Sequence, residues 1–545
     1  AARATAGSDA LGTLPDLHAA ARGGAAAALE IPGVPLGNGA TGTLELRRFT
    51  NLAPGAQVIA VHAGGREIPV ETGVTLYRGS LAGEPGSLAV VGVSPHGTHG
   101  FIRRAERGTL VISSGPQGAG LPAVVSRFAA TAPPVGEDFC DLSDPRVTHE
   151  MMAEAVEAAP LGRRSNAETG ACRIVDVAVD TDVEFTWRLF QGNTTASAAY
   201  IQTLFAAASE IYRRDVGAEL RLTYVRVWAA DEDPYGRLPD TASFLSAMRS
   251  WWNENETHIE RDVVHALSGR SLGGGRAYLN ALCSQWNGYG VSGNMRGFFP
   301  TPTQSHHADN WDLYVVAHEL GHNFGTHHTH DTATYNPVVD GCGLGDCSDA
   351  YGGTIMSYCH QCTGGIANID LRFHPRVIDR IRGYLATVDW CLDRGEGIAA
   401  ADDTTHVARG ASVAIDVLAN DRLEACDGGL AGEAAGVTSV DPVSDAGGSV
   451  TLLPDGRILY TAPEGFDGSD AFRYRIGFGG LDAAEGVVRL YCPSDLGRDG
   501  STDVDDLLAF LGLFRVSSPA ADADGDGLVT VNDLLSYLGA FRGGC

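Results

Sequence analysis

The stretch from His318 to His328 constrains this chain most, because its histidines stand at positions that suit a single metal ion. The apolar residues before it suit a buried helix, on which His318 and His322, four residues apart, share one face. Gly325 can adopt a positive φ, so the helix can end there and let His328 return as a third ligand. Three neutral imidazoles hold zinc and leave its fourth position open for water.

Glu319 directly follows the first of these histidines, where its carboxylate can reach a water on the metal. Zinc lowers the pKa of such a water towards neutrality, and we expect Glu319 to take its proton as it attacks a carbonyl. His327 and His330 are interpreted as spectators, with an alternative third ligand left open. The competing interpretation is a solvated, histidine-rich helix end, which the length of the pattern disfavours.

Length and composition favour a secreted protein of several domains. A chain of 545 residues is too long for one ordinary core, and its net charge of −28 argues against nucleic-acid binding. No run of about 18 apolar residues predicts a transmembrane helix. The chain begins at Ala1 without a signal-peptide pattern, so we expect that a secretion signal has been removed. Its 11 cysteines favour disulfides and an oxidising location, secreted or at the cell surface.

A methionine-containing turn follows the histidine motif at Gly353-Thr354-Ile355-Met356-Ser357-Tyr358, in a chain with only 5 methionines. With the motif it resembles the Met-turn of metzincin zinc peptidases, in which a methionine underlies the metal. Alone, Met356 would be read as core filling. The resemblance to astacin-like and serralysin-like members implies that Tyr358 approaches the metal and holds the oxyanion, and plain packing of that ring is the equally weighted alternative.

Residues 166–396 are predicted to form an α/β zinc-peptidase domain, with an edge strand at 275–283 that could bind an extended peptide by strand addition. Their segments 262–269, 277–283 and 318–325 resemble the reprolysin (adamalysin) metzincins. Two positions depart from that family: Thr329 follows the third histidine where aspartate is usual, and Tyr358 follows the methionine. Strands are expected at 174–180, 220–228 and 263–267, and helices at 196–214, 241–256 and 374–390.

The cysteines near the Met-turn are interpreted as two local disulfides, with a second zinc site as the alternative; they are Cys342, Cys347, Cys359 and Cys362. The reprolysin resemblance further implies a Cys283–Cys391 pair. Cys172 and Cys426 are then left without an assigned partner, and the sequence does not fix the connectivity.

Residues 1–165 read as a β-rich domain of short alternating strands separated by Gly and Pro. Segments 76–87 and 93–97 resemble the reprolysin pro-domain, and a generic β-sandwich is the alternative. Cys140 is isolated from the other cysteines, so its thiolate could occupy the open zinc position as a latency switch; an inert or differently paired thiol is equally compatible. The dibasic pair Arg163-Arg164 is a candidate site for removal of this domain.

Residues 397–491 alternate apolar and polar residues and resemble cadherin-like or immunoglobulin-like β-sandwich modules, for which we expect a spacer role. Residues 492–545 contain a repeated acidic loop followed by a helix, and resemble a small helical dockerin. The predicted calcium ligands of the second loop are Asp522, Asp524, Asp526, Leu528, Thr530 and Asp533. The first loop is expected to bind more weakly, through Asp495, Asp499, Ser501, Asp503 and Asp506. A solvated acidic turn is the alternative for both, and Cys492 and Cys545 could staple the repeat.

The sequence therefore predicts a secreted zinc endopeptidase made as a zymogen. Its expected parts are a β-rich pro-domain, an α/β metzincin domain, a β-sandwich and a calcium-binding repeat. Protein or peptide substrates, and a cohesin-like or cell-surface partner for the repeat, are expected. The alternative is a calcium-dependent adhesion or scaffold protein with an idle protease domain, but an idle site has no chemical need for Glu319.

Overall fold

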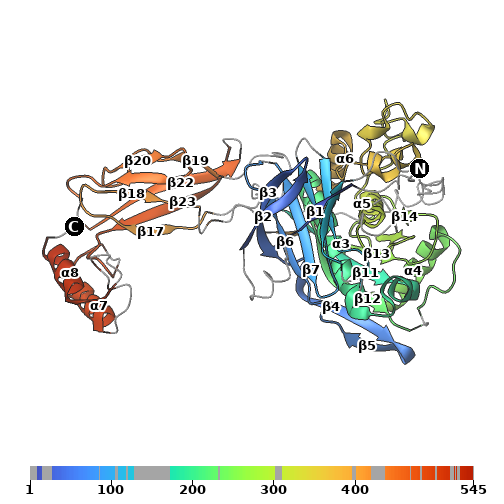
Figure 1. Ribbon diagram of the computed structural model, residues 1–545, viewed down its shortest axis with the longest axis horizontal. Coiled ribbons are helices and arrows are strands. Elements are labelled where there is room, and N and C mark those ends of the chain that lie inside the picture. The colour runs from blue at the N-terminus through green and yellow to red at the C-terminus, as the bar shows by residue number, and fades with distance from the viewer. Residues whose placement is uncertain are drawn as a thin grey trace. The chain divides into compact units, whose positions relative to one another are not determined.

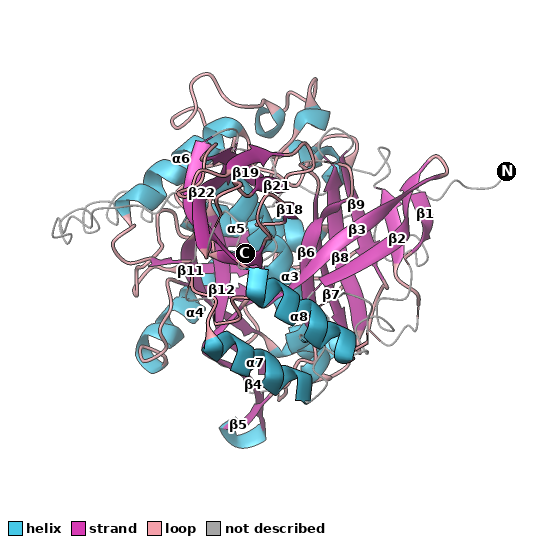
Figure 2. Ribbon diagram, turned by 90° about the vertical axis from the view of Figure 1, so that its left-hand side faces the viewer, coloured by secondary structure: helices cyan, strands magenta, loops and turns pink. Residues whose placement is uncertain are grey.

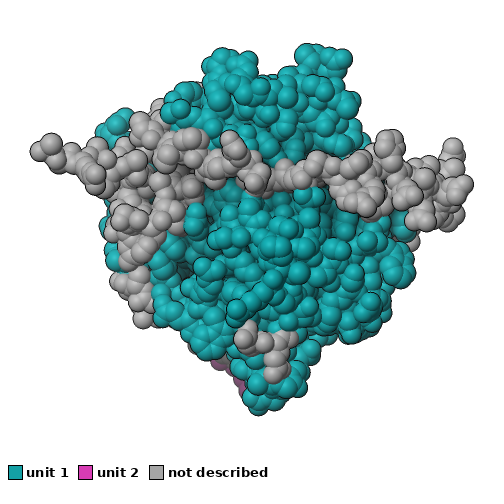
Figure 3. All heavy atoms as spheres, turned by 90° about the vertical axis from the view of Figure 1, so that its right-hand side faces the viewer, with its two compact units in different colours: residues 1–166, 172–395, 426–432 teal, residues 167–171, 396–425, 433–545 magenta. Residues whose placement is uncertain are grey.

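The computed structural model describes residues 9–14, 28–84, 86–104, 108–117, 121–127, 172–230, 233–300, 310–395, 400–418, 421, 436–466, 468–478, 481–497, 500–515, 521, 523 and 528–543. The chain divides into two compact units. The first contains residues 1–166, 172–395 and 426–432, and its described atoms form the teal body of Figure 3. The second contains residues 167–171, 396–425 and 433–545. We call residues 9–127 the N-terminal region and residues 172–395 the central region.

The N-terminal region forms an eight-stranded antiparallel sheet in the order β1-β10-β9-β8-β7-β6-β3-β2. Side chains of this sheet build a core of their own, which includes Leu46, Tyr77 and Ile102. The strands are β1 (Asp9–Thr13), β2 (Ala28–Gly37), β3 (Ala40–Phe49), β6 (Thr75–Leu81), β7 (Leu88–Ser94), β8 (Gly97–Arg104), β9 (Gly108–Ser113) and β10 (Val124–Arg127).

A second, mixed sheet contains strands of both regions, in the order β14-β15-β13-β11-β12-β4-β5, with β16 paired to β11. Its strands β4, β12, β11, β13 and β15 are parallel. They are β4 (Leu52–His62), β5 (Arg66–Pro69, after the 3-10 turn η1, Ala63–Gly65), β11 (Arg173–Thr181), β12 (Ala218–Trp228), β13 (Val263–Leu267), β14 (Gly275–Ala277), β15 (Tyr289–Ser292) and β16 (Asp393–Arg394). Residues 57–61, assigned above to the N-terminal domain, thus belong to a sheet shared with the central region.

Strand β14 is shorter than the predicted edge strand at 275–283. It ends at Ala277, and the chain then turns through positive φ angles at Asn280 (53°) and Cys283 (60°). Within this turn, the amide of Asn280 donates to the carbonyl of His322 at 3.1 Å. The turn therefore ties the end of the edge strand to the histidine helix.

The helices of the central region begin and end at residues suited to those places. The side chain of Asn193 accepts from the amide of Ala196 at the start of α3 (Thr194–Val216), which ends at Gly217 with φ 72°. Asp240 caps α4 (Thr241–Asn255), and Pro375 opens α6 (Pro375–Thr387). The histidine helix is α5 (Trp311–Asn323), and the short helical turns are η2 (Phe185–Leu189), η3 (Cys342–Leu344), η4 (Ala350–Gly352), η5 (Cys359–Gln361) and η6 (Gly365–Asn368).

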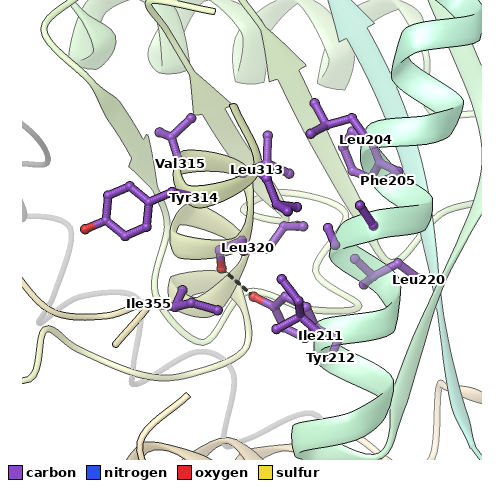
Figure 4. Close-up of a cluster of buried hydrophobic side chains, with 14 of the residues drawn as sticks. Leu204, Phe205, Ile211, Tyr212, Leu220, Leu313, Tyr314, Val315, Leu320 and Ile355 are labelled. Carbon is purple, nitrogen blue, oxygen red and sulfur yellow. Dashed lines mark hydrogen bonds between the residues drawn. The ribbon is translucent and has the colours of Figure 1, made fainter. Parts of the chain in front are cut away.

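Helix α3 lies between the two sheets and supports α5 (Figure 1). Figure 4 shows Leu204, Phe205 and Tyr212 of α3 facing Leu313 and Leu320 of α5, whereas Tyr314 points away from α3. The Tyr212 hydroxyl donates to the carbonyl of Ala317 at 2.8 Å. Apolar packing and this bond fix the histidine helix in the core of the first unit.

The second unit contains a two-sheet β-sandwich and a helix pair. Its sheets have the orders β17-β23-β22-β19 and β18-β21-β20 around a core that includes Tyr460, Phe472 and Tyr474. Helices α7 (Val504–Arg515) and α8 (Val531–Gly543) lie side by side in Figure 2, with Phe510 and Tyr537 stacked at 3.9 Å between ring centroids. The strands are β17 (Asp403–His406), β18 (Ser412–Ile415), β19 (Gly436–Val440), β20 (Ser449–Leu452), β21 (Ile458–Thr461), β22 (Ser469–Phe478) and β23 (Leu481–Tyr491).

Candidate metal centre and active site

The structure brings His318, His322 and His328 together as the sequence spacing predicts. All are buried, and one ligand atom from each lies within 4.8 Å of the others. The chain turns after α5 at Gly325, whose φ is 90°. A Cβ there would lie 2.6 Å from Cγ of Tyr384, so both the backbone angle and the packing require glycine. The turn returns His328 to 3.1 Å from His322, measured between their Nε2 atoms.

Backbone carbonyls orient two of the three imidazoles. His318 Nδ1 lies 2.7 Å from the carbonyl oxygen of Ile355, and His322 Nδ1 lies 2.8 Å from that of Thr326. Because a carbonyl only accepts, each Nδ1 carries the proton and each Nε2 keeps its lone pair for a ligand. Burial lowers the pKa of His322 to about 3, and burial together with neighbouring histidines lowers the pKa of His318 and His328 well below the ordinary value. The triad is therefore a set of neutral nitrogen donors, which suits zinc.

Glu319 is fully buried beside the edge strand β14. A Cβ at Gly275, the first residue of β14, would lie 2.6 Å from Cδ of Glu319. The absence of a side chain at Gly275 is therefore what lets the carboxylate lie against the strand. The carboxylate also affects its surroundings: burial and then the charge of Glu319 raise the pKa of Tyr212.

Met356 is fully buried beneath the histidine helix. A Cβ at Gly321, which lies between His318 and His322 on the helix, would be 2.6 Å from the Met356 sulfur, so the helix and the turn are in direct contact. The amide of Thr329 donates to the Met356 carbonyl at 3.0 Å, and its hydroxyl does so at 3.2 Å. The threonine that departs from the reprolysin pattern thus ties the segment that contains His328 to the Met-turn.

Tyr358 is buried among the three histidines. Its ring centroid lies 4.5 Å from that of His328 and 6.3 Å from that of His318. This position is compatible with both roles expected of it, a hydroxyl near the metal and a packed ring.

The sequence analysis missed the contribution of three further residues. The ring of His330, interpreted as a spectator, stacks on His328 at 5.2 Å and lies 4.7 Å from Tyr358. The hydroxyl of Tyr314 donates to the carbonyl of Ser357 at 2.7 Å and lies 3.0 Å from Nδ1 of His360. Tyr314 precedes His318 by four residues, so helical spacing was the available signal for its place beside the triad. These contacts bind the Met-turn to α5.

Disulfides stabilise the loops around this site. Cys342 pairs with Cys359 and Cys347 with Cys362, so the alternative of a second zinc site there is wrong. The implied Cys283–Cys391 pair is also present. Cys172 and Cys492 are disulfide-bonded as well. The other cysteines named above lie outside the described residues; they are Cys140, Cys426 and Cys545.

The described part of the acidic repeat shows loop-closing carboxylates. Asp506 accepts from the amides of Gly497 (2.6 Å) and Asp503 (2.9 Å), and Asp533 accepts from those of Ala523 (2.8 Å) and Thr530 (2.6 Å). The remaining described positions of the two predicted calcium sites are Asp495, Ser501 and Leu528, and Asp499, Asp522, Asp524 and Asp526 lie outside the described residues. Calcium binding therefore stays a prediction.

Two family models match parts of this chain. Residues 171–370 match the reprolysin-type model of metallo-peptidase family M12, and residues 396–488 match the bacterial Ig domain. Disintegrin and metalloproteinase domain-containing proteins 1a and 1b of Mus musculus are each 26% identical over 156 residues, which cover 28% of this chain and 18% of each relative. The chain therefore spans less than a fifth of the length of these relatives. Metalloproteinase-II from Bacteroides fragilis is similar at a TM-score of 0.34 and 10% identity, over 69% of this chain and 96% of that one.

The matches identify a reprolysin-like metallopeptidase domain and a β-rich Ig-like region in a multidomain chain. The match over residues 171–370 indicates a domain of the enzyme class that the histidine motif predicts, the zinc metalloendopeptidases. Among the described residues, none of the helices combines the length and the apolar character needed to span a membrane.

Proposed function

We propose that this chain is a secreted endopeptidase that cleaves internal bonds of extended protein or peptide segments. The observation that carries the proposal is the convergence of three buried, neutral histidines beside Glu319. Glu319 and two of the histidines lie on α5, which packs against the edge strand β14. A set of histidines without a nearby carboxylate could equally hold a structural metal ion. A buried carboxylate beside the triad adds the general base that hydrolysis needs.

The donor set fits zinc. His318, His322 and His328 would hold the ion through nitrogens whose opposite ring positions, in the first two, face backbone carbonyls. Zinc bound there supplies a Lewis acid that polarises a carbonyl and lowers the pKa of water.

Glu319 moves the proton. Its carboxylate accepts a proton from the attacking water as the new carbon–oxygen bond forms. It then passes that proton to the nitrogen of the leaving amine, and the carbon–nitrogen bond of the tetrahedral species breaks. Burial beside β14 keeps this carboxylate away from bulk water and within reach of a chain lying on the strand. The hydroxyl of Tyr358, whose ring lies beside His328, would donate a hydrogen bond to the developing oxyanion.

Strand β14 is the proposed substrate-binding strand. It ends the order of the mixed sheet, so one of its edges has no partner among the strands that the structure describes. An extended peptide can add to such an edge through main-chain hydrogen bonds, which select extended conformation rather than sequence. The contact between Gly275 and Glu319 would place a peptide on this strand next to the general base.

The flanking parts supply regulation and attachment in this proposal. Cys140 would hold the enzyme latent as a thiolate ligand until the chain is cut near Arg163-Arg164. The acidic repeat would bind calcium through its two loops and engage a cohesin-like or cell-surface partner. The disulfides and the bacterial Ig domain are what support an extracellular location.

Metal analysis with a casein assay tests the proposal against an idle scaffold. The full chain should contain one zinc per chain before and after cleavage in 160–166, and it should digest casein after that cleavage. A zinc chelator should abolish digestion, and added zinc should restore it. Bound zinc with no digestion in either form would favour the scaffold alternative.

A further inference from the structure

The sheet of the N-terminal region is apolar on both faces. On β8, Ile102 faces the region's own core, whereas its neighbour Phe101 belongs to the core of the central region. The same alternation appears on β9, where Ile112 faces the first core and Val111 the second. A sheet that stood apart would expose one of these faces to water, and a strand with apolar residues on both faces is typical of a buried layer.

The second face of this sheet covers helix α3, which is buried along nearly its whole length (Figure 1). Gly92 of β7 lies against Thr203 of α3, so closely that a Cβ at Gly92 would be 2.9 Å from Cβ of Thr203. The opposite side of α3 packs on β12 and supports α5. The N-terminal sheet therefore supplies one wall of the helix that positions the zinc ligands.

Polar groups across this contact are paired and buried. Glu210 of α3, 1% exposed, lies 3.2 Å from Arg78 of β6 and 3.2 Å from Arg213. Burial alone would raise the pKa of Glu210, but the charges of Arg213 and Arg78 hold it below its ordinary value. Separation of the two regions would remove Arg78 and leave a carboxylate with half of its compensating charge.

Gln202 of α3 accepts hydrogen bonds from two residues of the N-terminal region. The side chain of Asn51 donates to the Gln202 carbonyl at 2.9 Å, and the Thr72 hydroxyl donates to its side-chain oxygen at 2.6 Å. Both bonds are buried, so their loss would leave polar groups unsatisfied unless water entered.

Strand β4 extends the sheet of the central region. Residues 57–61 pair in parallel with residues 224–228 of β12, and the carbonyl of Val61 accepts from the amide of Ala229 at 2.8 Å. Below this ladder, the amide of Leu222 donates to the carbonyl of Asn51 at 2.7 Å. Removal of β4 would expose the backbone edge of β12 along the length of the pairing.

We propose that the N-terminal region is a permanent structural partner of the peptidase domain, which folds and unfolds with it and stays bound after the chain between them is cut. This inference goes beyond the proposed function, because it concerns the folding unit and would hold for an inactive protein. A cut in the segment between the two regions would change latency, while the sheet and the core that the regions share would remain intact.

The tryptophans allow a test in the full chain. All 7 lie in the central region, at positions 187, 228, 251, 252, 286, 311 and 390, so tryptophan fluorescence reports on that region alone. Ile102→Ala removes a buried side chain from the N-terminal core, and Ile476→Ala is the matched control in the β-sandwich core. Both are made in a Glu319→Gln chain to prevent self-digestion.

If the regions form one folding unit, Ile102→Ala lowers the midpoint of the fluorescence transition by several degrees, or abolishes the native emission, and Ile476→Ala leaves it unchanged. An unchanged midpoint in Ile102→Ala, with an earlier separate transition in circular dichroism, overturns the proposal.

A cut chain gives the second measurement, which does not depend on a destabilised variant. A recognition sequence for a site-specific protease replaces residues 160–166 in a Cys140→Ser chain; Cys140 is the one cysteine before Cys172, so no disulfide can then join the fragments. After cutting, the fragments should elute together in native buffer and separate in denaturant. Arg78→Ala should promote their separation more than Arg47→Ala, an exposed arginine at the paired position on β3. Separation of the parent fragments in native buffer contradicts the proposal.

Discussion

Gly275 and Glu319 are in contact across the edge of the active site: a Cβ added at Gly275 would lie 2.6 Å from the carboxyl carbon of Glu319. The first residue of β14, the proposed substrate-binding strand, therefore lies directly against the proposed general base. The side chain of Glu319 is buried, so it has little room to move aside.

Gly275→Ala should therefore displace the carboxylate while leaving the histidines untouched. We expect kcat to fall about tenfold or more, because a small misplacement of a reacting group is costly, with zinc content unchanged. Gly383→Ala on α6 is the matched control, since a Cβ there meets no atom within 4 Å. Equal kcat values for Gly275→Ala and the parent would show that the carboxylate does not depend on this space.

Tyr358→Phe tests the proposed oxyanion donor. The substitution keeps the ring, which packs against His328, and removes only the hydroxyl. If that hydroxyl stabilises the transition state, kcat should fall on the order of tenfold or more with little change in KM or zinc content. Tyr351→Phe, at an exposed tyrosine, serves as the control. An unchanged kcat in the zinc-loaded Tyr358→Phe enzyme would reduce this residue to packing.

Cys140→Ser tests the proposed latency switch. A hydroxyl is a far poorer zinc ligand than a thiolate, so the uncut variant should digest casein where the uncut parent does not. Equal latency of the two uncut chains would exclude the switch and leave steric blocking as the cause.

Asp526→Ala tests calcium binding at the second acidic loop. Loss of a charged ligand should weaken calcium binding by about tenfold or more, while casein digestion continues. The control is Asp505→Ala, at an exposed aspartate that is not a predicted ligand. Loss of digestion in a folded Asp526→Ala chain would mean that the repeat is coupled to the active site.

The part of the site that the sequence predicts is the part encoded by local spacing. His318 and His322 lie four apart on a helix, and the positive φ of Gly325 returns His328, so short-range geometry is sufficient. The presence of two local disulfides in the loops, although not which cysteines pair, and most strands of the central region follow from short-range patterns as well.

The parts that the sequence did not predict depend on long-range pairing. Strand β4 reads as a strand in either context, and periodicity does not specify that its partner is β12, more than 150 residues away. The contact of Gly275 with Glu319 likewise depends on how the sheet edge meets α5. His330 had no spacing signal, because its role comes from stacking on His328 after the chain has turned.

The most direct test of the account is Glu319→Gln, compared with the parent after both chains are cut within residues 160–166. The histidines are unchanged, so zinc content should equal that of the parent, while casein digestion should fall by several orders of magnitude because an amide cannot accept the proton of water. A zinc-loaded Glu319→Gln enzyme that digests casein as fast as the parent would contradict the account.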